Sequence, residues 1–300
     1  MIEIQNVTKS FGPDTAVENI SATLGEGRIF GLIGSNGAGK STLLRMMAGV
    51  LKPDAGEILI DGMSVYENPE AKRLICLLAD TAYYFPNARP MDMAAYYRLQ
   101  YPDFDMEKFR RYLQGFQLPN DRKISAFSKG QKRQIQILLG ICAGTRYLIC
   151  DETFDGLDPV ARQAVKGILS GELLERGLTP VIASHNLREL EDICDCVGLI
   201  HQGRILFTGD LDSMKWNLSK IQCVIPDEAA EAALMKQLDI LHWNRTGTLL
   251  TMTVRGEREA VMAAVNQTSP LFAEVLPLSL EEIFISETEA IGYDIQDFIA

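Results

Sequence analysis

Residues 34–42 read Gly34-Ser35-Asn36-Gly37-Ala38-Gly39-Lys40-Ser41-Thr42, and this stretch decides the fold. Its spacing fits G-x-x-x-x-G-K-[ST], the pattern of a loop that surrounds the phosphates of a nucleotide. The apolar run 28–33 before it predicts a buried strand. Leu43, Met47 and Leu51 after it lie at i, i+4 and i+8, as on one face of a helix. Because strand, glycine-rich loop and helix follow in this order, we interpret residues 34–42 as a phosphate-binding loop and not as a surface turn.

This interpretation gives each part of the loop a role. The glycines keep Cβ atoms out of the way, so that backbone N–H groups can point at an anion. The helix that follows adds partial positive charge at its N-terminus. We therefore predict that all nine residues, Gly34 to Thr42, contact the nucleotide. Lys40 should reach the β- and γ-phosphates, and the Ser41 hydroxyl should ligate Mg²⁺.

A second signal is an apolar strand that ends in two carboxylates. Tyr147–Cys150 is apolar throughout and is followed by Asp151 and Glu152. Behind a phosphate loop, Asp151 offers Mg²⁺ a hard oxygen ligand. Glu152 is the next residue, turned away from the metal position and able to polarise an attacking water. We predict that Asp151 is a metal ligand and that Glu152 is catalytic.

Composition narrows the class of partner. The chain has 300 residues and a formal net charge of −11, with no long lysine or arginine run. A DNA or RNA partner usually leaves a basic footprint, so we expect no direct nucleic-acid binding. No uninterrupted apolar stretch reaches the ~18 residues of a membrane-spanning helix. The first residues also lack the basic start and apolar core of a signal peptide, so we expect a cytoplasmic protein.

The pattern of elements divides the chain in two. Residues 1–210 alternate apolar strands with helical patterns, which predicts an α/β domain, and residues 81–130 interrupt it with a helical, aromatic-rich subdomain. Residues 211–300 follow a β-α-β-β-α-β order, which is the ferredoxin-like arrangement of a small accessory domain. That domain carries no chemical motif. A regulatory or dimer-supporting role and a purely structural one are both open.

Over residues 1–210 the chain resembles the ATP-binding subunits of ABC transporters. Four further elements stand in that family's order and position. They are Phe11, matching the aromatic that stacks on adenine; Phe127-Ser128-Lys129-Gly130-Gln131, matching the LSGGQ signature; Gly156-Leu157-Asp158-Pro159, matching the D-loop; and Ser184-His185, matching the switch histidine. The resemblance implies a P-loop NTPase fold of ABC type, with a mixed sheet and a helical subdomain, that binds ATP and Mg²⁺. It also implies nucleotide contacts from Phe11, from Ser128, Lys129, Gly130 and Gln131, and from Asp158, with His185 catalytic beside Glu152 and Lys40.

Two departures from the family pattern concern charge. Asp80 stands where the family usually has the glutamine of the Q-loop. A carboxylate there is shorter and charged, and we predict that it contacts the nucleotide site as a ligand of Mg²⁺ or of water. Lys129 replaces the first glycine of the signature and adds positive charge beside an incoming nucleotide.

The resemblance implies a dimer. Two such subunits, identical or related, would enclose ATP head to tail, with the loop of one facing residues 128–131 of the other. A separate membrane permease, docked near residues 80–100 on the inner face of the cell membrane, would be driven by their closure, with export of a peptide, drug or lipid as the expected direction. The alternative is a soluble ABC-type ATPase that acts on DNA or ribosomes. A P-loop small-molecule kinase would have no use for residues 128–131.

Overall fold

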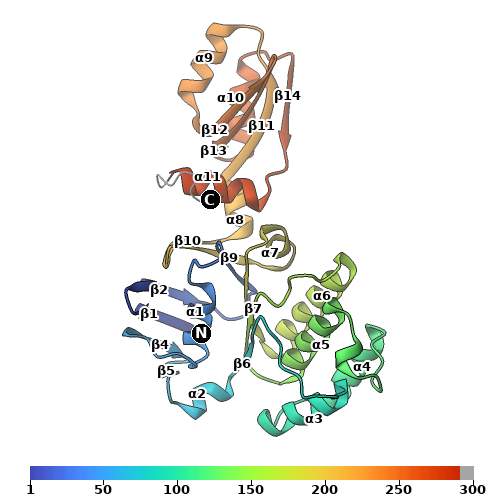
Figure 1. Ribbon diagram of the computed structural model, residues 1–300. Coiled ribbons are helices and arrows are strands. Elements are labelled where there is room, and N and C mark those ends of the chain that lie inside the picture. Colours follow the sequence, from blue (N-terminus) through green and yellow to red (C-terminus); the bar gives the residue numbers. More distant parts are fainter. Residues whose placement is uncertain (291–300) are drawn as a thin grey trace. The chain divides into compact units, whose positions relative to one another are not determined.

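The computed structural model describes residues 1–290 of the chain (Figure 1). It forms two compact units, which divide between Thr208 and Gly209 and which we treat separately. No helix in the described part of the chain combines the length and the apolar character that crossing a bilayer requires.

The centre of the first unit is a six-stranded, mainly parallel sheet with the order β10-β9-β3-β8-β7-β6. Its strands are β3 (Phe30–Ile33), β6 (Ile75–Leu78), β7 (Tyr147–Asp151), β8 (Thr179–Ser184), β9 (Cys196–His201) and β10 (Arg204–Asp210). Every residue of β7 and β8 is buried, as expected for parallel strands that are covered on both faces. This sheet accounts for the continuous apolar runs of the sequence.

The register of this sheet places three chain segments at one edge. Ile33, the last residue of β3, pairs with Ser184 at the end of β8, and Asp151 at the end of β7 pairs with Ala183. The residues that follow these strands therefore leave the sheet side by side. Ligands of open α/β sheets bind at this carboxyl edge of the strands.

A smaller antiparallel sheet with the order β2-β1-β4-β5 packs with the first helix around one core. The strands are β1 (Ile2–Phe11), β2 (Asp14–Leu24), β4 (Ala55–Ile60) and β5 (Met63–Ser64). The helices of this part of the unit are α1 (Lys40–Met47), α2 (Pro69–Arg73), α6 (Pro159–Arg176) and α7 (Leu187–Ile193). Leu43, Leu44, Met46 and Met47 of α1 are all buried in that core.

The helical subdomain has its own core. It contains α3 (Pro90–Gln100), α4 (Met106–Gly115), a 3₁₀ turn (Ile124–Ala126) and α5 (Lys129–Cys142). Figure 1 shows these helices together beside the large sheet. The core runs from Ala88 through Phe109 and Phe127 to Cys142, so α5 packs into it well beyond the residue 130 at which the sequence suggested an end.

The second unit contains a four-stranded sheet with the order β12-β13-β11-β14, whose neighbours are all antiparallel. Its elements are α8 (Leu211–Asn217), β11 (Leu218–Val224), α9 (Glu228–Gln237), β12 (Asp239–Thr246), β13 (Leu249–Arg255), α10 (Arg258–Gln267), β14 (Phe272–Leu276) and α11 (Leu280–Ala290). Leu234 of α9 and Val261 and Val265 of α10 are buried with the strands. From β11 to β14 the elements follow the β-α-β-β-α-β order on which the ferredoxin-like interpretation rests.

Candidate active site

The glycine-rich loop joins β3 to α1 at the carboxyl edge of the large sheet. Lys40, the first residue of α1, is only 5% exposed. Its ammonium group donates to the carbonyl oxygens of Gly34 (2.7 Å) and Ser35 (3.1 Å) and lies 3.1 Å from Oε1 of Glu152. The loop therefore curls around a buried cation, which is the arrangement that attracts a phosphate.

Gly39 is the residue that this curl requires. Its φ of +106° is in the left-handed region, and a Cβ there would lie 2.3 Å from the carbonyl oxygen of Ala16. Gly37 also has a positive φ, +82°, but a Cβ on Gly37 would meet nothing within 4 Å. A side chain at Gly37 would therefore strain only the backbone, whereas a side chain at Gly39 would also collide with Ala16.

We expect Gly39→Ala to destabilise the fold more than Gly37→Ala and to weaken ATP binding. In Gly37→Ala the alanine must adopt a left-handed backbone, which costs about 1–2 kcal/mol of stability. Gly39→Ala must also displace the Ala16 backbone, so its total loss of stability should be roughly 3 kcal/mol or more. Urea denaturation of the two variants measures the difference. Equal free energies of unfolding would contradict the assigned role of the Ala16 contact.

Ser41 and Asp151 lie together beside the loop. The Ser41 hydroxyl donates to Oδ1 of Asp151 over 2.8 Å, and Asp151 is 2% exposed. Burial raises the pKa of the Asp151 carboxyl, and the Ser41 hydrogen bond opposes that rise. A partly buried hydroxyl and a buried carboxylate are the hard oxygen donors that Mg²⁺ prefers, so the residues fit the ion.

Glu152 and His185 meet at the same edge, as their strand ends predict. Nδ1 of His185 lies 2.8 Å from Oε2 of Glu152 and 3.3 Å from Oδ2 of Asp155. Burial is the main cause that raises the pKa of Glu152; a hydrogen bond to Asp155 adds to it, while His185 and Lys40 oppose it. A carboxylate with raised proton affinity is a better general base.

A cavity of about 430 Å³ unites most of the predicted residues. Its wall contains Ser35, Asn36, Gly37, Gly39, Lys40, Ser41 and Thr42 of the loop, together with Ala16, Asp80, Glu152, Asp155 and His185. Gly34 contributes its carbonyl to Lys40, and Ala38 is a buried residue of the loop. Ala16 and Asp155 carry no motif of their own. Asp155 is the more informative, because it follows the strand of Asp151 by four residues and accepts a hydrogen bond from the Ser184 hydroxyl (3.0 Å).

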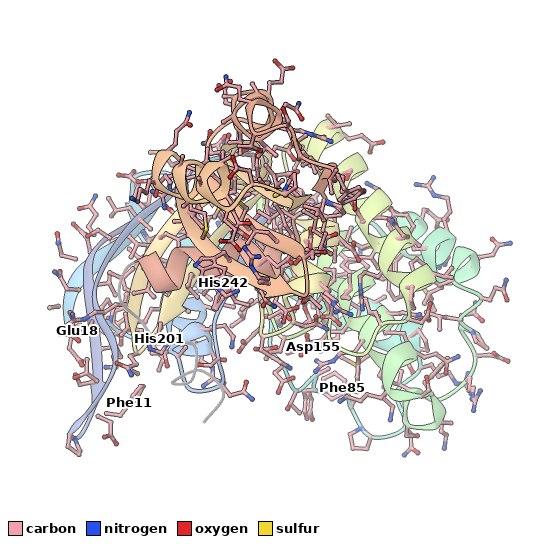
Figure 2. The ribbon with its side chains drawn as sticks, turned by 90° about the horizontal axis from the view of Figure 1, so that it is seen from above. Phe11, Glu18, Phe85, Asp155, His201 and His242 are labelled. Carbon is pink, nitrogen blue, oxygen red and sulfur yellow. The ribbon has the colours of Figure 1, made fainter. Side chains whose placement is uncertain are left out.

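The other predicted residues lie outside that wall. Ser128 caps α5: its hydroxyl accepts from the Gln131 backbone N–H, and the Gln131 side chain accepts from the Ser128 N–H. Lys129 and Gly130 form the first turn of α5, and Asp158 caps α6 through the Ala161 N–H (2.9 Å). Phe11 is half exposed near the end of the β1–β2 hairpin, where Figure 2 labels it, with the Lys9 ammonium 5.6 Å from its ring centre.

Known proteins resemble this chain in sequence and in structure. A family model described as "ABC transporter" matches residues 17–155. The linearmycin resistance ATP-binding protein LnrL of Bacillus subtilis (strain 168) is 32% identical over 215 residues, which cover 70% of this chain and 69% of LnrL. The chain belongs to the ABC transporter family.

Two further comparisons extend the likeness beyond the loop region. The ABC transporter ATP-binding protein YtrB of the same organism is 28% identical over 287 residues, 96% of this chain and 98% of YtrB. A solved ATP-binding subunit of an ABC transporter has a TM-score of 0.65 at 25% identity, over 72% of this chain and 92% of that one. The ABC cassette fold predicted from the sequence is confirmed.

Membership of the ABC family identifies the activity of the chain. ABC ATP-binding subunits bind ATP with Mg²⁺ and hydrolyse it, and this subunit is an ATPase. The contacts of Lys40, Ser41 and Asp151 are consistent with that activity. The roles of the individual residues remain our predictions.

Proposed function

We propose that this ABC subunit pairs head to tail with a second ATP-binding subunit, identical or related, and that their closure on ATP drives a separate membrane permease. The observation that carries the proposal is the incomplete cavity. Lys40, Glu152 and His185 meet in one wall, whereas the capped N-terminus of α5 lies elsewhere on the chain. The backbone N–H groups of such an N-terminus favour an anion. A second subunit would present its own α5 to the open side of the nucleotide.

Each residue then has a defined task. Lys40 and the loop N–H groups hold the phosphates, and Glu152 accepts a proton from the attacking water. His185, held by Glu152 and Asp155, is placed to contact the γ-phosphate. Ser41 and Asp151 would hold Mg²⁺, which neutralises phosphate charge. Phe11 would stack on the adenine, and Asp158 would contact the nucleotide across the pair.

Loss of the γ-phosphate removes charge that both subunits share, so hydrolysis favours the open pair. A permease that contacts both subunits would change conformation when the pair opens or closes. We place the subunit on the inner face of the cell membrane, bound through that permease. LnrL is named as a resistance protein, which supports export of a peptide, drug or lipid as the direction of transport.

Complementation between two inactive variants tests the head-to-tail pair, in its simplest form of two copies. Lys40→Ala removes the loop cation, and Ser128→Arg blocks the N-terminus of α5. Alone, each variant should be inactive, because both sites of its own pair are damaged. Mixed, half of the pairs contain both variants and have one intact site, so about a quarter of the wild-type ATPase rate should return.

The control mixes two separate preparations of Lys40→Ala, in which no pair has an intact site. Recovery in the control would point to contamination by an active ATPase. If the Lys40→Ala and Ser128→Arg mixture stays inactive while both variants fold as the wild type does, a pair of identical subunits is excluded.

A further inference from the structure

Asp80 is bound to a residue of the helical subdomain. Its carboxylate Oδ1 accepts a hydrogen bond from the Arg133 guanidinium over 2.6 Å, and its backbone carbonyl accepts a second one from the same group. Arg133 lies on α5, one turn after the capped N-terminus. The pair therefore connects the segment after β6 directly to the helix that carries residues 128–131.

Arg133 is well fixed for this contact. Its side chain is 9% exposed, whereas that of Asp80 is 58% exposed. The guanidinium also donates to the side chain of Gln136 (3.3 Å), and Gln136 in turn donates to the Ala79 carbonyl (2.6 Å). Arg133 and Gln136 of α5 thus both donate hydrogen bonds to residues 79 and 80. An ion pair with a buried, geometrically fixed arginine is screened less than a surface pair.

Asp80 also lies at the proposed nucleotide site. It belongs to the wall of the cavity that holds Lys40 and Glu152, and to the wall of a neighbouring cavity of about 500 Å³ that contains Tyr84 and Arg133. A carboxylate in the first wall is a ligand that Mg²⁺ accepts readily. Arg133, which lines the second cavity, holds the same carboxylate by a hydrogen bond. Glutamine, the family's usual residue here, is neutral and could not form this ion pair.

We propose that Arg133 is a positioning residue that holds the Asp80 carboxylate on α5 and thereby withholds it from the Mg²⁺ position beside Ser41 and Asp151. The two cations compete for one anion. If Asp80 turned to the metal position, Arg133 would lose its carboxylate partner, and while Arg133 holds Asp80, that carboxylate is not available to Mg²⁺. The inference needs only the binding of Mg²⁺ and ATP by one subunit, and it stands apart from the proposed pairing and permease.

This competition predicts the direction in which the Mg²⁺ requirement for ATP binding should change. Arg133→Gln frees Asp80, so the Mg²⁺ concentration for half-maximal binding of a fluorescent ATP analogue should fall about tenfold, within the range that a charge-assisted hydrogen bond is worth. In an Asp80→Asn background the same substitution should change the Mg²⁺ requirement by less than about twofold, because no carboxylate is left to free. Magnesium titrations at fixed analogue concentration on the isolated subunit measure both.

Arg133→Lys keeps the charge, loses the planar fork and should shift the requirement in the same direction by less, so it replaces Arg133→Gln if that variant folds poorly. Arg110→Gln, which removes an exposed ion pair with Glu107, is the matched control and should leave the Mg²⁺ requirement unchanged. An unchanged or higher requirement in both Arg133 variants overturns the proposal. So does an equal shift with and without the Asp80 carboxylate, which would mean that Arg133 acts through packing alone. Neither result would bear on whether subunits pair.

Discussion

Glu152→Gln is expected to slow ATP hydrolysis about 100- to 1,000-fold, within the range that a positioned general base contributes. ATP binding should stay within about threefold of the wild type, because the amide keeps the size of the side chain and can still meet Lys40 and His185. The variant therefore separates binding from chemistry.

The reason lies in the surroundings of the carboxylate. Glu152 follows the end of β7 with a left-handed φ of +52°, and its N–H donates to the Ala183 carbonyl (3.0 Å). This fixed backbone directs the side chain to Lys40 on one side and His185 on the other. Glutamine can adopt the same position, but it cannot take a proton from water. If the proposed pair forms, ATP that is bound and not hydrolysed should hold it closed.

Three measurements check this expectation. Steady-state phosphate release gives the rate, a fluorescent ATP analogue gives the affinity, and size-exclusion chromatography with and without ATP and Mg²⁺ shows whether a dimer accumulates. Glu70→Gln is the control, since Glu70 is exposed and forms a surface ion pair with Arg73. Rapid turnover by Glu152→Gln would refute the catalytic assignment of Glu152.

The centre of the site could be predicted from sequence because its determinants are local. Each of Ile33, Asp151 and Ser184 ends a strand of one parallel sheet, and the apolar runs before them mark those strands clearly. Parallel strands bring their carboxyl ends to one edge. The contact between Glu152 and His185, 33 positions apart, thus follows from two strand boundaries and the sheet order.

The antiparallel sheet was harder to predict because its strands are irregular. The residue pattern of 14–24 does not reveal the strand β2, although Val17, Ile20 and Leu24 are buried. Asn6 on β1 and Asn19 on β2 both have positive φ, and the pairing of the two strands shifts register near them. Each shift breaks the alternation of buried and exposed residues that reveals a strand. The sequence of β2 therefore lacks a regular alternation of apolar and polar residues, although the strand itself is continuous.

Contacts that depend on two separate elements left no local signal at all. Asp80 could be singled out because it departs from the family's glutamine, but nothing near it points to Arg133, 53 positions later. The buried carboxylate of Glu172 is similar. In sequence it is one acidic residue of a long amphipathic helix, and only the tertiary contacts of that helix show that it is buried.

Glu172→Ala is expected to lower the free energy of unfolding by about 3–5 kcal/mol at neutral pH, the cost of breaking a buried ion pair by removing one partner. Glu172 lies on α6 and is 2% exposed. Its carboxylate accepts from the Lys108 ammonium (2.7 Å) and the Tyr112 hydroxyl (3.1 Å) of α4, and from Nε of Arg176 (2.5 Å). Alanine would leave two partly buried cations beside each other without an anion.

The pH dependence of that loss has a definite sign. Burial raises the pKa of the Glu172 carboxyl, but the hydrogen bonds from Lys108 and Arg176 outweigh it and hold the pKa below the ordinary value of 4.5. A carboxyl whose pKa is lowered by folding stabilises the fold above its unfolded pKa and loses that contribution as the pH falls through its folded pKa. The stability gap between wild type and Glu172→Ala should therefore be fully present at pH values well above 4.5 and should narrow progressively below that value.

Urea denaturation at neutral pH and at a series of acidic pH values measures that gap, with Glu107→Ala as the control because Glu107 is a largely exposed residue of α4. The control should change stability by no more than about 0.5 kcal/mol at any pH at which the fold persists. Glu172→Gln separates charge from size: it retains a carbonyl acceptor and should lose less than alanine does, with the same narrowing in acid. A loss near that of the control, or a gap that widens as the pH falls, would show that the carboxylate does not hold α4 and α6 together through its charge.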